Sequence, residues 1–272
     1  MNISNPRIQL AFALLCTAIF TLFAGKADAQ ILNIERHRLK SDTVRFLMNA
    51  RFGLNINNRS AAEDSPVNLF GVNSAANAIY KGDKHGYIFV GQTDYLSIND
   101  SEFLNFGFAH FRVNFFRDRK LNYEAFTQAS YDNFRGLDPR ILGGVGIRLR
   151  VVETEKSELI LGLGGFYENE RWQHPDNEST VEAEFVKVSA YASVRKDFNE
   201  NLTFNAVLYY QGGYDAGIED VRHRVSGNVN FNTKITKRLA LNNSFEFGYE
   251  DKPIVPITKF IYALRTGVLI SL

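Results

Sequence analysis

Apolar and polar residues alternate along most of this chain, beginning near residue 44. In the stretch 44–56 the even positions are apolar, whereas the odd positions include Arg45, Arg51 and Asn55. Successive side chains of a β-strand point to opposite faces, so this spacing predicts a strand with one apolar face. A helix would spread the same apolar side chains around its axis.

The same period-two pattern recurs at regular intervals and predicts about twelve strands. The expected strands are residues 44–56, 70–80, 87–95, 105–115, 121–131, 141–151, 159–167, 186–194, 202–210, 221–231, 239–249 and 260–272. Several approach the roughly 9 to 11 residues that a tilted strand needs to cross a bilayer. The second and tenth are the weakest, because Ser74 and His223 interrupt their apolar faces. We therefore expect an all-β fold, a single closed antiparallel transmembrane β-barrel.

The connections between these strands are expected to differ in length. Short polar turns follow the even-numbered strands, and longer loops are expected after the odd-numbered ones, the longest of them at 168–185. Outer-membrane barrels combine short periplasmic turns with longer external loops. This parity predicts that both termini are periplasmic.

Aromatic residues gather at both ends of the expected apolar faces. We expect them to form girdles at the two membrane interfaces, where amphipathic rings are favoured. The girdle candidates are Tyr80, Tyr87, Tyr95, Phe115, Tyr123, Tyr131, Tyr167, Tyr210 and Tyr249. The alternative is a soluble barrel or sandwich with these rings in its core, but twelve faces of large side chains would overfill a small soluble barrel.

The first residues predict export. Arg7 precedes an apolar run at 8–24, which is too short for a membrane-spanning helix, and residues 27–29 read Ala-Asp-Ala, a small-x-small cleavage pattern. We expect cleavage after Ala29 and localisation in the outer membrane of a Gram-negative envelope. An uncleaved N-terminal anchor is the alternative.

The chain is therefore expected to contain three parts: a signal peptide at 1–29, a periplasmic N-terminal segment at 30–43 and the barrel at 44–272. Its one cysteine, Cys16, lies in the part that would be removed. We expect neither disulfides nor thiolate metal sites in the mature protein.

A formal net charge of +1 provides no basic surface for binding nucleic acid. The charged residues are informative instead about the interior of the expected barrel. The residues expected to line the lumen are Arg45, Arg51, Asp94, His110, Arg112, Glu124, Arg148, Arg150, Arg195, Arg222, Arg224, Glu246 and Arg265. Because arginine outnumbers acid, they indicate a narrow, anion-leaning passive pore. An interior of arginine–carboxylate pairs that braces a structural envelope barrel is an equally good interpretation.

An outer-membrane lipid hydrolase is a second hypothesis, because barrels of this size can carry a serine–histidine pair. Neither His110 nor His223 has a suitable serine on its own strand face, since Ser226 points away from His223. We expect no catalytic residue, no metal and no cofactor. Glycines at 143–146 and 162–165 lie inside strands, where they favour close packing rather than a nucleotide fingerprint.

The segment 168–183 contains Glu168, Glu170, His174 and the only tryptophan, Trp172. We expect a solvated acidic loop here. A calcium site that bridges lipopolysaccharide, or a contact that would make this a docking barrel for another envelope protein, is the alternative.

Three short segments resemble a known family. They are Asn33-Ile34-Glu35 with Arg38, the run Gly-Phe-Ala-His-Phe-Arg at 107–112, and Glu-Ala-Phe-Thr-Gln at 124–128. Together they resemble the domain-of-unknown-function 481 family, outer-membrane barrels sometimes labelled salt-induced outer membrane proteins. The resemblance implies a fold and a membrane rather than an activity.

The C-terminus resembles the signal that the outer-membrane insertion machinery reads on a last strand. Its elements are Arg265, Gly267, Ile270 and Leu272, with leucine where an aromatic residue is usual. The expected partners are thus this machinery, outer-membrane lipid and lipopolysaccharide.

Overall fold

A computed structural model describes residues 45–58, 66–177, 179–236 and 238–270, and these residues form twelve strands. The strands are β1 (Phe46–Asn58), β2 (Asn68–Lys81), β3 (His85–Ile98), β4 (Ser101–Phe115), β5 (Leu121–Asp132), β6 (Leu137–Glu153), β7 (Ser157–Gln173), β8 (Thr180–Asp197), β9 (Leu202–Asp215), β10 (Asp220–Lys234), β11 (Leu239–Glu250) and β12 (Phe260–Ile270). A short 3-10 helix, η2 (Asn133–Arg135), lies between β5 and β6. The prediction of twelve strands is confirmed, including the two weakest.

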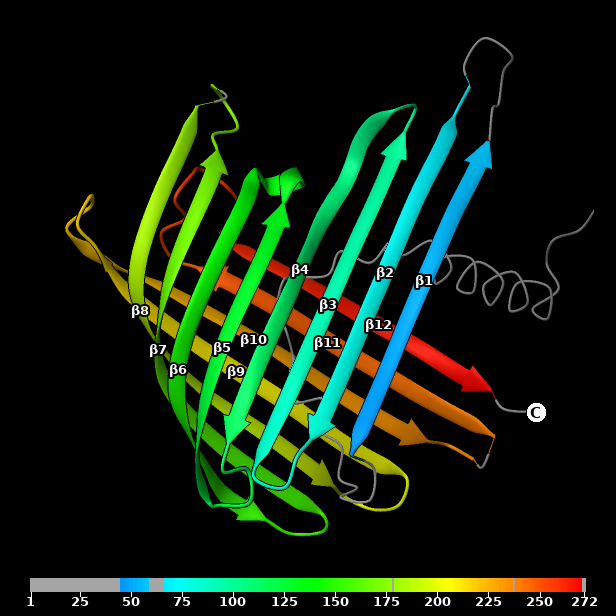
Figure 1. The fold of residues 1–272 in the computed structure, drawn as a ribbon. Coiled ribbons are helices and arrows are strands. Elements are labelled where there is room, and N and C mark those ends of the chain that lie inside the picture. Colours follow the sequence, from blue (N-terminus) through cyan, green and yellow to red (C-terminus); the bar gives the residue numbers. More distant parts are fainter. Residues whose placement is uncertain (1–44, 59–65, 178, 237, 271–272) are drawn as a thin grey trace, which may run out of the picture.

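All twelve strands belong to one antiparallel sheet in which every strand pairs with its neighbours in sequence. The sheet curls strongly, so that β1 to β7 form one wall and β9 to β12 the wall behind it, with β8 at the bend (Figure 1). In the described residues no ladder joins β1 to β12. The all-β antiparallel fold is confirmed, whereas closure into a complete barrel stays a prediction.

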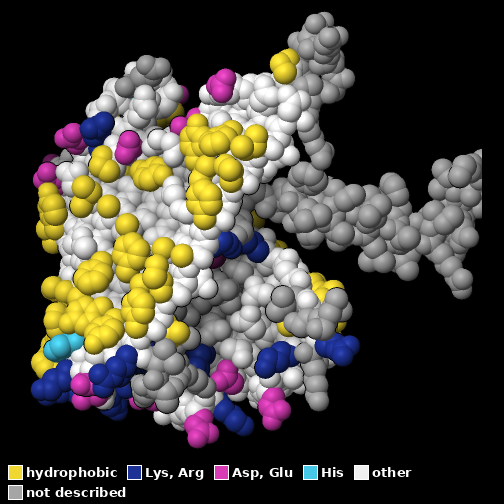
Figure 2. All heavy atoms as spheres, turned by 45° about the vertical axis from the view of Figure 1, so that its right-hand side comes forward, with side chains coloured by type: hydrophobic (Ala, Val, Ile, Leu, Met, Phe, Trp, Pro, Cys, Tyr) yellow, Lys and Arg dark blue, Asp and Glu magenta, His cyan; other side chains and the backbone are white. Residues whose placement is uncertain are grey.

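The alternation of side chains decides which face of the sheet is which. Outward positions are apolar and exposed, as for Val186, which is 76% exposed, while inward positions are polar and buried, as for Glu168 at 0% and Asn122 at 0%. Hydrophobic side chains therefore cover the outer surface, with charged side chains gathered along its lower edge (Figure 2). Most large apolar residues lie on the outer face, although some, such as Phe166 and Trp172, are buried.

The predicted difference in loop length holds for some connections only: the long connection 251–259 follows an odd-numbered strand, β11, but other connections after odd-numbered strands are short. β3 and β4 are joined only by Asn99 and Asp100, both with positive φ, as a tight hairpin requires. The expected loop 168–185 shrinks to the connection 174–179, because β7 and β8 continue well beyond the predicted strand ends. β7 extends past the apolar band with polar residues on both faces, whereas the first residues of β8 alternate with apolar side chains such as Phe185 turned inward.

The connection between β11 and β12, residues 251–259, turns into the curl of the sheet instead of outward. Val255 on this connection is buried against Leu137 and Trp172, with Ile254 and Ile257 packed at the edge of the cluster. The segment runs behind β6 and β7 in Figure 1. We call residues 251–259 the inner loop.

Among the described residues, no helix is long and apolar enough to cross a membrane.

Candidate functional site

The interior contains a cluster of buried charges centred on β7. Glu168 and Glu170 point inward from β7 and are fully buried. Arg140 of β6 lies 2.6 Å from Glu168 and 3.1 Å from Glu170, and Lys187 of β8 forms an ion pair with Glu168. Buried carboxylates are tolerated only when they are paired in this way. We call Arg140, Glu168, Glu170, Lys187 and Arg224 the charge cluster.

Arg224 connects strands that are not neighbours in the sheet. Its guanidinium, on β10, lies 3.0 Å from Glu170 of β7, and it also pairs with Glu250 of β11. Trp172 donates its indole N–H to the other oxygen of Glu170 at 2.9 Å. These contacts cross the interior, so the curvature of the sheet is held by ion pairs as well as by the backbone ladder.

A second interior group lies deeper in the curl, on β4, β5 and β8. Arg112 pairs with Glu124 at 3.2 Å, and the Tyr191 hydroxyl donates to the same carboxylate oxygen at 3.1 Å. The Phe126 ring lies 5.5 Å from the Arg112 guanidinium and 6.1 Å from the stacked His110 ring. His110 in turn bonds Gln128 through Nδ1 at 3.2 Å. Every charge in this group has an aromatic or acidic partner.

Gly162 shows why glycine recurs in these strands. A Cβ at Gly162 would lie 2.0 Å from the Tyr191 ring, so only glycine lets that ring lie flat across β7. The close-packing interpretation of the strand glycines is confirmed at this position.

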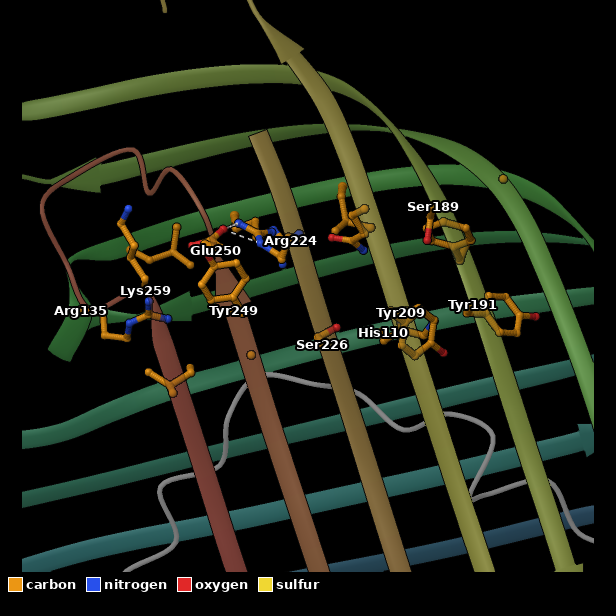
Figure 3. Close-up of a pocket in the computed structure, with 18 of the residues that line it drawn as sticks. His110, Arg135, Ser189, Tyr191, Tyr209, Arg224, Ser226, Tyr249, Glu250 and Lys259 are labelled. Atoms are coloured by element: carbon orange, nitrogen blue, oxygen red, sulfur yellow. Dashed lines mark hydrogen bonds and ion pairs between the residues drawn. The ribbon is translucent and has the colours of Figure 1, made fainter. Parts of the chain in front are cut away.

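Between the two interior groups lies a cavity of about 150 Å³. Its wall includes His110, Phe126, Trp172, Tyr209 and Gln211. Figure 3 shows Arg135 and Lys259 at the end near the inner loop, and His110 with Tyr209 farther along the wall. We call this space the central cavity.

Most of the predicted lumen residues do face the interior. His110, Arg112, Glu124 and Arg148 are buried, and those that remain partly accessible inside are Asp94, Arg150, Arg195, Arg222, Arg224, Glu246 and Arg265. Glu246 pairs with Arg265 at 3.0 Å.

Arg45 and Arg51 are the exceptions. Both are exposed, and Arg45 pairs at the surface with Asp83 of the β2–β3 turn. β1 is an edge strand in the described residues and pairs only with β2 there. Their place along a lumen stays a prediction.

The aromatic candidates lie on the outer surface. Six are well exposed, namely Tyr80, Tyr87, Tyr123, Tyr167, Tyr210 and Tyr249, and the half-buried ones are Tyr95, Phe115 and Tyr131. Tyr80 and Tyr87 lie 5.9 Å apart between ring centroids, on neighbouring strands. Their role as girdles stays a prediction.

The prediction of a solvated acidic loop around Trp172 is wrong. Glu168, Glu170 and Trp172 belong to β7 and are buried inside, whereas His174 and Asp176 remain in the exposed connection. No group of three potential metal ligands occurs in the part of the chain that the structure describes. The sequence gives little signal for this burial, because the opposite face of β7 is also polar here, with Asn169 and Arg171.

The other residues that sequence reasoning missed are Arg140, Tyr191, Tyr209 and Gln211. Arg140 was placed before its strand, and the two tyrosines lie on the polar face where they were not expected. Only the curl of the sheet brings them to one cavity.

Neither His110 nor His223, the two candidates for a catalytic histidine, has a serine as its hydrogen-bond partner among the described residues. His110 bonds Gln128, and His223 bonds the Tyr210 hydroxyl at 2.7 Å on the outer face.

The C-terminal signal is only partly described. Arg265 points inward to Glu246, Gly267 borders open space and Ile270 is exposed. Leu272, like the expected signal peptide and the segment 30–43, lies outside the described residues.

These features define a class of protein: a strongly curled, twelve-stranded antiparallel sheet with an apolar exterior and an ion-paired, polar interior. The model of the family described as "Protein of unknown function, DUF481" matches residues 68–255, and the chain belongs to this family. No curated protein matches. Among solved structures, a NanC porin is similar at 11% identity and a TM-score of 0.43, over 84% of this chain and 99% of that one.

Proposed function

We propose that this protein is an integral outer-membrane β-barrel with a narrow, gated solute path. The observation that carries the proposal is the inverted distribution of side chains, with an apolar exterior around buried ion pairs. Lipid is the solvent that favours this arrangement, because alternating strands then satisfy an apolar outside and a wet inside.

The proposal includes β1 and β12 meeting in the membrane. An open sheet edge leaves unpaired N–H and C=O groups, which cost several kcal/mol each in hydrocarbon. Closure therefore follows from a membrane position, together with export through a signal peptide at 1–29 and contact with lipid, lipopolysaccharide and the insertion machinery.

Bracing by ion pairs, rather than anion selectivity, is the main role that we propose for the interior arginines. Arg112, Arg140 and Arg224 are each held by one or more carboxylates. A paired guanidinium contributes little field to a passing anion. The inner loop further narrows the path at one end.

Fractionation of cell envelopes tests the location. We expect the protein in the outer-membrane fraction, with faster migration of the unheated form on electrophoresis. A soluble periplasmic protein would contradict the proposal.

Current measurements in planar lipid bilayers test whether the proposed interior path conducts ions. We expect small single-channel currents whose selectivity changes little in Arg112→Gln, while Arg148→Gln with Arg150→Gln, nearer the β6–β7 turn, reduces any anion preference. If neither the wild type nor a variant without the inner loop conducts any current, the proposed solute path is contradicted and the barrel has a structural role only.

A further inference from the structure

The central cavity has properties that bracing does not require. It is partly open, is lined by residues of β4 to β12, and reaches Lys259 of the inner loop. Cavities of about 150 Å³ in proteins accommodate a six-membered ring. The size alone thus permits a small cyclic solute.

Three arginines of the cavity wall, away from the end with Arg135 and Lys259, are each paired with a carboxylate. Arg112 pairs with Glu124, Arg140 with Glu168, and Arg224 with Glu170 and Glu250. An ionic solute in the centre would have to displace one of these buried partners, which is costly. A neutral solute faces no such competition.

The cavity wall contains two buried acceptor atoms that are open to a solute. Nε2 of His110 and Oε1 of Gln211 are both buried without a hydrogen bond among the described residues. His110 is 3% exposed, and because its Nδ1 donates to Oε1 of Gln128, Nε2 is left as an acceptor. Both atoms accept hydrogen bonds, so they fit a solute that carries hydroxyl donors.

The remaining wall is aromatic. Phe126, Trp172, Tyr191 and Tyr209 border the same space, and the Tyr191 and Tyr209 ring centroids lie 5.2 Å apart. Aromatic side chains pack against the C–H face of a solute ring, while a few polar atoms of the site form hydrogen bonds with groups at the edge of that ring.

We propose that the central cavity binds a neutral, hydroxylated six-membered ring, the chemical class of the monosaccharides. His110 and Gln211 accept hydrogen bonds from its hydroxyls, and the aromatic side chains hold its faces. This inference rests on the proposed function for its route of entry, because the solute reaches the cavity along the interior path.

The single tryptophan provides the measurement. Trp172 borders the cavity, so its fluorescence in the folded, detergent-solubilised protein reports occupancy. We expect D-glucose or D-galactose to produce a saturable change with a dissociation constant on the order of 1 mM, and D-glucuronate to bind no better. Equilibrium dialysis with labelled sugar measures the same binding without relying on the fluorophore.

Variants locate the site. We expect Gln211→Leu and His110→Phe each to weaken sugar binding about five- to tenfold, as expected for one lost hydrogen bond. Gln92→Leu is the matched control, since Gln92 lies on β3 outside the cavity wall and bonds Asp94. Heat-modifiable migration verifies that each variant is folded.

Three results would overturn the inference: no binding of either hexose by wild type in both assays, binding of glucuronate alone, or an equal loss in Gln92→Leu. Glucuronate alone would point to Arg135 and Lys259 at the cavity end. Because binding is measured in detergent, its failure is distinguishable from a failure of outer-membrane localisation.

Discussion

At the scale of single residues, the interior depends on a few side chains that satisfy several neighbours at once. Glu168 accepts contacts from Arg140 and Lys187 and lies 3.7 Å from Arg224, with no exposed surface. Removing this carboxylate takes the ion-pair partner from buried Lys187 and leaves Arg140 to Glu170 alone. Such a residue has much more effect than an ion pair at the surface.

Glu168→Gln tests this difference. We expect a loss of about 3–5 kcal/mol in the free energy of unfolding, because buried cations lose their partner. The matched control Glu153→Gln removes a carboxylate that is 61% exposed and pairs with Arg150, and should cost at most about 1 kcal/mol. Urea unfolding in lipid vesicles, followed by Trp172 fluorescence, measures both. Equal losses in the two variants would contradict the charge-cluster argument.

Gly162→Ala tests the close approach of β7 to Tyr191. The new methyl group would overlap the ring, and we expect a destabilisation of about 1–3 kcal/mol as the ring moves away from Glu124. Gly267→Ala is the control, because a Cβ there meets nothing within 4 Å. If both substitutions are neutral in the same unfolding assay, Gly162 is not required for packing.

At the scale of elements, the inner loop is the feature that most affects the path. Its apolar residues cluster with Leu137 of β6 and Trp172 of β7, and Lys252 forms an ion pair with Asp220 at the start of β10. His223 also donates its backbone N–H to Asp251 at 2.7 Å. The loop is therefore attached at both its apolar and its polar residues.

Val255→Ser should loosen this attachment. We expect larger single-channel currents and a loss of about 1–3 kcal/mol in the free energy of unfolding, because a hydroxyl replaces a buried apolar group without a partner. Ile218→Ser on the β9–β10 connection is the control, since Ile218 is exposed. Currents that stay at the wild-type level in Val255→Ser would show that the inner loop does not limit conduction.

At the scale of the whole molecule, orientation in the membrane is the main open prediction. The mature chain is expected to contain no cysteine, because Cys16 lies in the expected signal peptide. A single introduced thiol is thus a clean marker for either end of the sheet.

Asp83→Cys and Asn177→Cys place that thiol on opposite ends, in the β2–β3 turn and in the β7–β8 connection. With periplasmic termini, we expect a membrane-impermeant maleimide to label Asn177→Cys on intact cells, and Asp83→Cys only after the outer membrane is permeabilised. The reverse pattern would mean that the barrel has the opposite orientation.

The sequence by itself determined the strands, their number and their two faces. Alternation is a local property of the backbone, so residues such as Val186 and Arg148 could be assigned to opposite faces without any tertiary information. The pattern failed where the apolar face of β7 ended, as at Glu168 and Trp172, because the outward residues there are polar as well.

Only the tertiary structure decided which charges pair and what they enclose. The contacts of Arg224 with Glu170 and of Tyr191 with Glu124 join strands that are not adjacent in the sheet. The central cavity and the inward course of the inner loop follow from the same curl. Such contacts depend on the curvature of the whole sheet, and no local pattern of residues records that curvature.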